Sequence, residues 1–394
     1  MLLRASSLFF MFKDFLFSSF FVVFLWSYYQ QATNMREQRI YPVGIQDFEK
    51  LRKEKALYVD KTDLIYNLTR KYYVFLSRPR RFGKSLLSST LKYYFQGRKD
   101  LFQGLAIEQL EQEWVEYPVL HFDLSTAKNR DLAGIQSELD SQLRPYEVKW
   151  NIQLEAGKLP GQRLSVLIKR LHEQTGKKAV VIIDEYDAPM LDVLHDDERM
   201  AEVRKMMQEF YAPLKACDAD LRFVFITGIS PIFTDSILGG LNNFTDYSMQ
   251  SEFASICGFT KEELIKNCEA EILLLNKANE NKNEALEILH NKCGGYRFTS
   301  KEEEIYHPHY VLEAFKSNTA ISPWEIEHQL VRGMKEFLSQ SYKVCSESFY
   351  KSLWKDNLEI LPQLYLNGYL TIKSYDKVFG VYELGLPNMN YNII

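Results

Sequence analysis

Short apolar runs alternate with longer amphipathic stretches along the chain after Met35. The short runs are rich in β-branched and aromatic residues, which is typical of strands buried on both faces of a sheet. Strands are predicted at Tyr73–Ser77, Val119–Leu124, Ala179–Asp184 and Arg222–Thr227, and helices at Lys84–Phe95, Leu132–Leu143, Arg163–Gln174 and Glu202–Ala216. This alternation predicts an α/β fold, with a mostly parallel sheet and helices on both faces.

The pattern changes near Cys257, where strand-like runs give way to helical ones. Thr260 precedes Lys261, Glu262 and Glu263, and this order is typical of a helix N-cap followed by an acidic first turn. From there to about Lys316 the chain reads as helical, with a break at the paired glycines 294 and 295. We therefore expect a small helical lid behind the core.

The last segment predicts a helix through Leu361–Asn367 and two strands, Tyr369–Ile372 and Val378–Glu383, joined by a polar turn at Lys373–Lys377. A helix followed by a hairpin suggests a winged-helix-like unit. The expected division is an apolar N-terminal segment at residues 1–35, the α/β core at 36–256, the helical lid at 257–335 and the winged-helix-like unit at 336–394.

The amino-acid composition limits which classes of function are open to the chain. Hydrophobic residues make up 46% and charged residues 25% of the 394 residues, as in folded soluble proteins. The net charge of -4 gives no general attraction to nucleic acid, so a polyanion contact requires a local basic cluster. The five cysteines are scattered without a C-x-x-C pair or a nearby histidine at metal spacing, which indicates reduced thiols in a cytoplasmic protein and no cysteine-based metal site.

The N-terminal residues raise a separate question. Phe15–Tyr29 is an uncharged apolar run that is shorter than the roughly 20 residues of a membrane-spanning helix. Residues 1–34 are therefore either a membrane anchor or upstream translation before a protein that starts at Met35. A signal peptide is disfavoured because no small-x-small cleavage site follows the run cleanly.

The first predicted strand runs directly into the basic turn Arg78-Pro79-Arg80-Arg81-Phe82-Gly83-Lys84-Ser85, and a helix follows. A strand–loop–helix context with G-K-S is the arrangement of a P-loop, whose backbone N–H groups point at phosphates. Gly83 allows close backbone approach, Lys84 is placed to bridge the terminal phosphates, and the Ser85 hydroxyl is placed to ligate Mg²⁺. The predicted ATP-binding residues are Arg78, Arg80, Arg81, Phe82, Gly83, Lys84, Ser85 and Leu86.

A basic surface turn is the alternative, but four clustered cations repel one another unless an anion neutralises them. The turn also departs from G-x-x-x-x-G-K-[ST], because Arg78 stands at the first glycine position. Its side chain must either point away from the phosphates or grip them itself.

A second apolar strand ends in carboxylates at Asp184 and Glu185. We expect Asp184 to hold the magnesium ion beside Ser85 and Glu185 to act as the general base for the attacking water. Asp187 is expected only to cap the following turn. Solvated carboxylates are the alternative interpretation of such a strand end.

The strand at Arg222–Thr227 delivers Thr227 and Ser230 to the same edge of the sheet. In P-loop ATPases that have a strand inserted between the phosphate-binding motif and the acidic motif, a polar side chain at the end of that strand senses the terminal phosphate. Thr227 is the predicted sensor with Ser230 as the alternative, and both residues are also ordinary turn formers.

These motifs lie within longer stretches that resemble the AAA-ATPase-like family of bacterial and archaeal proteins, often joined to a PD-(D/E)XK-type nuclease domain. The resemblance covers about Tyr41 to Pro387. Its matching stretches are Pro42–Arg52, Tyr58–Leu68, Phe75–Leu91, Ile182–Asp187, Leu241–Ser248, Cys257–Leu264 and Gly295–Phe298. The resemblance implies that the R-P-R-R-F-G-K-S loop, with arginine at its first position, is the form that this family uses. It also implies that residues 80–85 bind nucleotide, with Asp184 and Glu185 as the acidic pair. The segment Gly44–Thr62 would then border the nucleotide base.

The chain departs from the family at GLPNMNYNII, where the nuclease half would begin, so we expect no nuclease chemistry. Two functions stay open. The first is a Mg²⁺-dependent ATPase whose cycle moves the helical lid. The second is a slow or inactive nucleotide-gated switch that serves a protein partner or self-association. A DNA contact by the C-terminal unit is weakly supported, because Asp376 lies between Lys373 and Lys377.

Overall fold

Five parallel strands form the central sheet in the order β2-β3-β4-β1-β5. The computed structural model describes residues 39–127, 131–154, 157–193, 196–230, 243–275, 282–301, 303–320, 341–345 and 364–387. The strands are β1 Tyr73–Ser77, β2 Val119–Asp123, β3 Ala179–Asp184, β4 Leu221–Gly228 and β5 Thr245–Asp246. Since all five run the same way, their carboxyl ends meet at one edge, where Asp123 pairs with Asp184 and Ser77 with Gly228. The predicted parallel α/β fold is confirmed.

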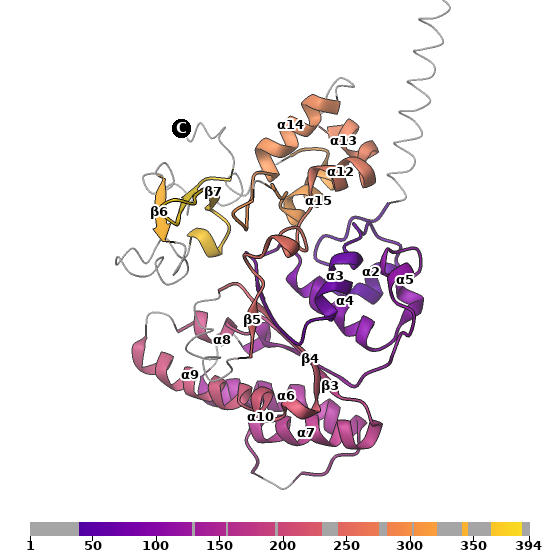
Figure 1. Ribbon diagram of the computed structural model, residues 1–394, viewed down its shortest axis with the longest axis vertical. Coiled ribbons are helices and arrows are strands. Elements are labelled where there is room, and N and C mark those ends of the chain that lie inside the picture. The colour runs from indigo at the N-terminus through magenta and orange to yellow at the C-terminus, as the bar shows by residue number, and fades with distance from the viewer. Residues whose placement is uncertain are drawn as a thin grey trace, which may run out of the picture.

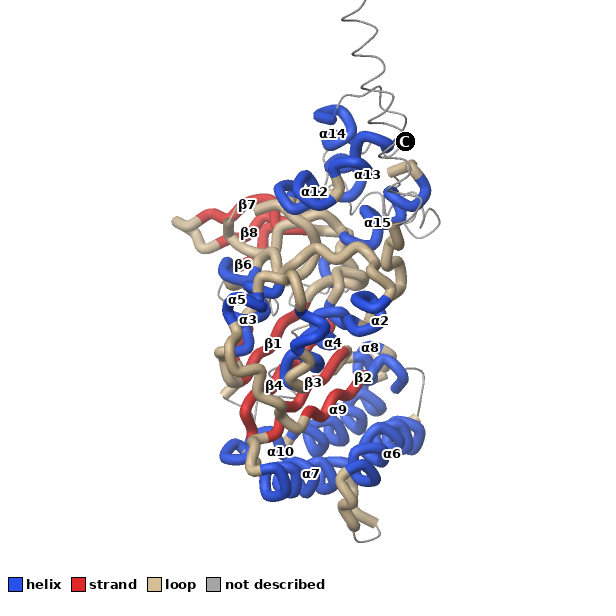
Figure 2. The backbone as a smooth tube through the Cα atoms, turned by 90° about the vertical axis from the view of Figure 1, so that its right-hand side faces the viewer, coloured by secondary structure: helices blue, strands red, loops and turns tan. Residues whose placement is uncertain are grey.

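Helices cover both faces of this sheet. The first face carries α3 Thr62–Thr69 and α4 Lys84–Phe95, against which α2 Phe48–Lys53 and α5 Ile107–Leu110 pack. The second face carries α6 Leu132–Lys149, α7 Pro160–Thr175, α8 Ala188–Leu191, α9 Asp197–Tyr211 and α10 Pro213–Ala216. Figures 1 and 2 show α6 and α7 at one end of the molecule and α12–α14 at the other.

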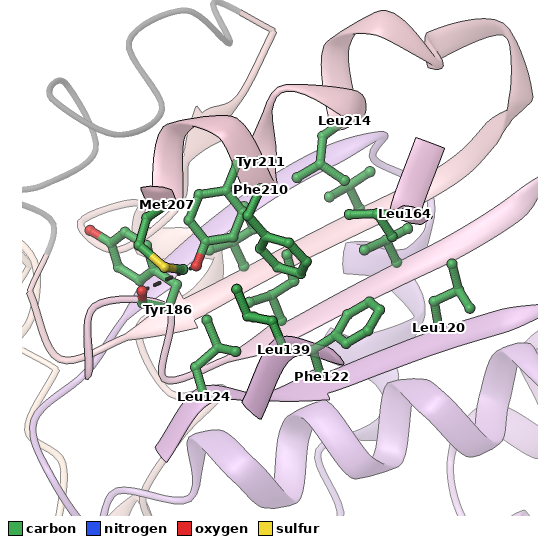
Figure 3. Close-up of a cluster of buried hydrophobic side chains, with 14 of the residues drawn as sticks. Leu120, Phe122, Leu124, Leu139, Leu164, Tyr186, Met207, Phe210, Tyr211 and Leu214 are labelled. Atoms are coloured by element: carbon green, nitrogen blue, oxygen red, sulfur yellow. Dashed lines mark hydrogen bonds between the residues drawn. The ribbon is translucent and has the colours of Figure 1, made fainter. Parts of the chain in front are cut away.

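The core alternates between these two faces along β3. Val181 and Ile183 pack into the cluster with α6, α7 and α9, whereas Val180 and Ile182 pack into the cluster with α3 and α4. Successive side chains of a strand point to opposite faces, which is why a continuous apolar run fits a strand covered on both sides. Figure 3 shows the first cluster, where the Tyr211 hydroxyl donates a hydrogen bond of 3.1 Å to the Tyr186 carbonyl.

Several predicted boundaries needed correction. The helix predicted to end at Leu143 continues to Lys149 through Pro145. The single helix predicted at 202–216 begins earlier, with Asp196 as its N-cap, and divides into α9 and α10 at Pro213. The two-residue strand β5 was not predicted, because its sequence is too short to show a pattern.

Within described residues 257–320, the helices that follow the core are α12 Lys261–Asn267, α13 Glu269–Leu274, α14 Lys282–Cys293 and α15 Pro308–Ser317. The predicted cap at Thr260 is confirmed, because its hydroxyl accepts from the Glu263 N–H while the Glu263 carboxylate accepts from the Thr260 N–H. The expected break is also found, since α14 ends just before the two glycines. The domain bounds assigned from the sequence stay a prediction.

The C-terminal part contains an antiparallel sheet in the order β6-β8-β7, formed by β6 Tyr342–Cys345, β7 Thr371–Asp376 and β8 Val381–Gly385. The turn predicted at 373–377 was misplaced, because β7 runs through most of it. Asp376 instead accepts from the N–H groups of Val378 and Phe379, and Gly380 adopts φ +60°. The two side chains at this tip are 86% and 78% exposed. The winged-helix assignment stays a prediction, since residues 346–363 lie outside the described ones.

Among the described residues, no helix combines the length and apolar character that crossing a bilayer requires. The predicted anchor at residues 1–34 lies outside the described part of the chain.

The contact between α7 and α9 generates a stability prediction. A Cβ added at Gly161 would lie 2.2 Å from the Glu209 carbonyl oxygen, and backbone cannot move aside cheaply. Gly161→Ala is expected to lower the free energy of unfolding by about 1–3 kcal/mol, measured by urea denaturation. Lys169→Ala, on the exposed side of α7, should change it by less than about 0.5 kcal/mol. Equal stabilities of the two variants would contradict this packing.

Candidate nucleotide-binding site

The loop between β1 and α4 is shaped by left-handed backbone at two positions. Gly83 is the N-cap of α4 and has φ +96°, and Arg81 has φ +63°. No heavy atom lies within 4 Å of a Cβ built on Gly83, so this glycine is required by its backbone conformation and not by lack of space. The bend directs the chain from β1 into the first turn of α4, whose N–H groups are available to an anion.

Lys84 lies beneath this loop with only 4% of its side chain exposed. Its Nζ donates to the Pro79 carbonyl at 3.2 Å and lies 3.6 Å from Oε1 of Glu185. A buried ammonium requires such partners, because an unpaired buried charge is costly. The ion pair therefore joins the phosphate loop to the end of β3.

Ser85 and Asp184 form the second link between the loop and β3. Burial raises the pKa of Asp184 to about 6, and the nearby Ser85 hydroxyl and the charge of Lys84 oppose this rise. The hydroxyl–carboxylate pair predicted to hold Mg²⁺ is brought together, and its donor oxygens are of the kind that Mg²⁺ prefers.

A cavity of about 420 Å³ opens over this loop. Residues 80–87 form one wall, and residues 42–46 and 57–59 form another that includes the apolar side chains of Val43, Ile45 and Leu57. Glu185, residues 256–259 and three residues of α15 also line the cavity, as do Leu51, Lys61, Ile65 and Thr90. The segments 42–46 and 57–59 lie within the stretch expected to border a base, and that role stays a prediction.

The charge balance of the cavity favours an anionic ligand. Of the ionisable side chains in its described lining, Lys61, Arg80, Arg81 and Lys84 are cationic and Glu185 is anionic. Such an excess of positive charge around a helix N-terminus fits a polyphosphate. The residues present therefore fit a nucleotide with its magnesium ion.

Arg78 corrects one predicted contact. Its guanidinium is buried and donates to the carbonyl oxygens of Ser77, Ser248 and Phe253 at 2.8, 2.8 and 2.9 Å. It also lies 4.5 Å from the centre of the Phe298 ring. Of the two orientations expected from the sequence, the structure shows the one that points away from the cavity, so the assignment of Arg78 to nucleotide binding is wrong for its side chain.

Phe82 also has a different environment from the expected one. Its buried ring packs against Tyr296, Phe298 and His307, with centroid distances of 5.1, 5.2 and 4.4 Å. Although Phe82 contributes to the cavity lining, its ring contacts join the phosphate loop to the segment between α14 and α15.

The two predicted sensors lie at the expected edge of the sheet but do not line the cavity. The buried Thr227 hydroxyl donates to the Leu76 carbonyl at 2.6 Å, a contact between β4 and β1. The Ser230 carbonyl accepts from the Tyr186 hydroxyl at 2.7 Å. These contacts give both residues a structural role at this edge, and the sensing role of Thr227 stays a prediction.

Asp187 was expected to cap the turn that follows it, and the structure shows a longer-range contact. Its carboxylate accepts from the N–H groups of Ile229 and Ser230, at 3.1 and 2.6 Å. A Cβ on Gly228 would lie 2.4 Å from Oδ1 of Asp187, so the glycine permits this close approach. Asp187 therefore links the end of β4 to the end of β3 through these hydrogen bonds.

Sequence reasoning missed the part of the site contributed by α15. Pro308, His309 and Leu312 line the cavity from this helix. The proline at the first helical position was a usable signal for the start of α15. Nothing in the sequence pattern indicated that this start faces the phosphate loop.

The strand order, the loop after β1 and the carboxylates after β3, with β4 between them, define a P-loop protein of the class in which one strand separates the two motifs. The chain matches the predicted AAA-ATPase family over residues 42–238, half of its length, and it belongs to that family. A match at this level supports nucleotide binding.

A curated relative is 28% identical over 360 residues, which cover 88% of this chain and 67% of the relative. It is an uncharacterized protein in the vnfD 5' region of Azotobacter chroococcum mcd 1.

Solved structures with partial likeness include Aeropyrum pernix ORC1 in complex with DNA, at 11% identity and a TM-score of 0.31, covering 84% of this chain and 90% of that one. Cdc6p from Pyrobaculum aerophilum matches at 13% identity and a TM-score of 0.26, covering 83% and 87%. These low scores carry no argument about the present chain.

The anchoring of Arg78 generates a prediction about stability. Arg78→Lys keeps the charge but cannot reach several carbonyls at once, so we expect about 2–4 kcal/mol less stability. Arg80→Lys, on an exposed neighbour in the same loop, should leave the melting temperature nearly unchanged. Thermal unfolding of the two variants checks this, and an unshifted Arg78→Lys protein would contradict the anchoring role.

The burial of Asp187 predicts a pH dependence of stability. Burial, followed by the charge of Glu185, raises the pKa of Asp187 to about 7, whereas the N–H of Ser230 opposes the rise. Between about pH 4 and pH 7 the folded state holds a proton that the unfolded chain has lost. This contribution to stability therefore falls with rising pH, by about 1.4 kcal/mol per pH unit. Denaturation at pH 5, 6 and 7 should show a shallower decline for Asp187→Asn, and parallel curves would argue against it.

Proposed function

We propose that this chain binds ATP with Mg²⁺ in the cavity over the phosphate loop and hydrolyses it. The observation that carries the proposal is the meeting of Lys84 and Ser85 with Asp184 and Glu185, across the position of β4. Two motifs far apart in the sequence are thereby in contact at one edge of the sheet.

Each side chain has a distinct role in this proposal. The first turn of α4 and Lys84 bind the phosphate chain, with Arg80 and Arg81 at the exposed side of the loop. Ser85 and Asp184 hold the magnesium ion, which supplies charge neutralisation on the phosphates. Residues 42–46 and 57–59 border the base, and Thr227 is the proposed sensor at the sheet edge.

Glu185 is the proposed general base. Its backbone has φ +53°, a conformation that is uncommon for a residue with a side chain, and it lines the cavity. Its carboxylate is paired with Lys84. Glu185 can accept a proton from water more readily once Lys84 transfers from it to phosphate, so binding and activation of the base are coupled.

The contacts of Arg78 and Phe82 support movement of a lid. Arg78 bonds to carbonyls of Ser248 and Phe253, and Phe82 packs against Tyr296 and His307. A change in the loop is therefore transmitted directly to the segments that carry α12–α15. We propose residues 257–335 as this lid and residues 336–394 as the winged-helix-like unit.

A slow nucleotide-gated switch is the second candidate. The Lys84–Glu185 pair favours it, because the base is held by a cation when the loop has this arrangement. In that case a protein partner or a second copy of the chain would set the turnover rate, since an arginine supplied in trans adds about a thousandfold or more. A DNA contact by the C-terminal unit stays a weaker proposal.

The ATPase proposal predicts a separation of binding from turnover. Glu185→Gln should bind ATP within about threefold of the wild type but turn over at least about a hundredfold more slowly. Lys84→Ala should lose both. Equilibrium dialysis and phosphate release with Mg²⁺ measure the two quantities, with Lys169→Ala as a surface control. If the wild type binds ATP but turns it over at a negligible rate, the result would favour the nucleotide-gated switch. If the wild type does not bind ATP, both the ATPase and the switch proposals would be rejected.

A further inference from the structure

His309 is the second residue of α15 and lines the same cavity as Arg81 of the phosphate loop. It is half-buried, and its ring packs beside His307 and Tyr310, with centroid distances of 6.4 and 5.2 Å. Within the described part of the chain its imidazole makes these ring contacts and no hydrogen bond. An imidazole with available nitrogens thus faces a cavity lined by cations.

We propose that His309 is a phosphate-contacting residue contributed by α15, and that its imidazole takes up a proton when nucleotide binds. This inference rests on the proposed function, because it assigns a further contact to the same nucleotide.

The surroundings of His309 disfavour its protonated form before an anion arrives. Burial, followed by the charge of Arg81, lowers its pKa, and Glu313 on the next turn of α15 opposes this only in part. His307 is the N-cap of α15, and its ring centre lies 6.4 Å from that of His309. The N-terminus of α15 also carries partial positive charge, which disfavours a second cation.

The remaining charged groups of the cavity lining are three cations and one carboxylate. Lys84 is paired with Glu185 and Lys61 with Glu263, and Arg80 lies on the exposed side of the loop. A phosphate placed against Arg81 neutralises that cation and adds negative charge beside the imidazole. Both effects favour protonated His309, so nucleotide binding and proton binding must strengthen one another.

His307 is the neighbouring alternative, and its position excludes it. Its side chain is buried among Phe82, Tyr296 and Tyr310 and does not line the cavity. A ligand in the cavity would therefore meet His309 first. The pairing of Arg81 from the loop with His309 from α15 places one cationic group on each side of the phosphate chain.

Calorimetric titration of the full chain with Mg²⁺ and ADP tests this directly, because ADP is not turned over. Measurements in two buffers of different ionisation enthalpy give the protons taken up per nucleotide, and the protons of ADP itself cancel between variants. His309→Gln should take up fewer protons than the wild type. It should bind about tenfold more weakly at pH 6, as expected for a lost charge-assisted hydrogen bond, and within about twofold at pH 8.

Two further variants keep the test decisive. His309→Arg carries a permanent cation, so it should bind tightly at both pH values without the extra proton uptake. His172→Gln is the control, since His172 lies on α7 and is bonded to Asp220. Equal proton uptake and equal affinity in wild type and His309→Gln would overturn the proposal. Failure of the wild type to bind ADP or ATP would instead reject the proposed function, and this inference with it.

Discussion

The ion pair between Lys84 and Glu185 is the contact on which the site depends. It exists because β1 and β3 run parallel, with β4 between them, so that the loop after β1 and the carboxylates after β3 emerge at one edge. The parallel direction is set by helices that return along both faces, and these helices are held by continuous apolar strands. Burial of the lysine then makes the pairing obligatory, because neither charge is stable alone in that environment.

The contacts of Arg78 explain why an arginine can stand at the first position of the phosphate loop. A glycine is usual there because backbone must pass close to phosphates, yet Arg78 turns its side chain to the opposite side of the loop. Carbonyl oxygens of residues 77, 248 and 253 receive its N–H groups, and Phe298 stacks on the guanidinium. These contacts fix the loop to the segments that precede α12 and α15, and a glycine at this position would lack them.

The sequence predicted the elements whose signals are local. The bounds of β1, β3 and α4 follow from buried apolar runs and from the G-K-S turn, and the meeting of Ser85 with Asp184 follows from parallel topology. The orientation of Arg78, the aromatic surroundings of Phe82 and the cavity wall formed by α15 depend on residues distant in the chain, so no local pattern encodes them. The hairpin turn was misplaced because the second half of β7, Lys373–Asp376, is mostly polar and partly exposed and therefore resembles a turn in sequence.

The residues at the end of β3 make contacts on two sides of the sheet edge. Asp184 and Glu185 face Ser85 and Lys84 of the phosphate loop. Tyr186 and Asp187 instead hold the residues after β4, through the carbonyl and the N–H of Ser230. The two sides are electrostatically coupled, because the charge of Glu185 raises the pKa of Asp187. Both sides of this edge are thus linked to the phosphate loop, one through the ion pair of Lys84 with Glu185 and the other through the charge of Glu185 beside Asp187.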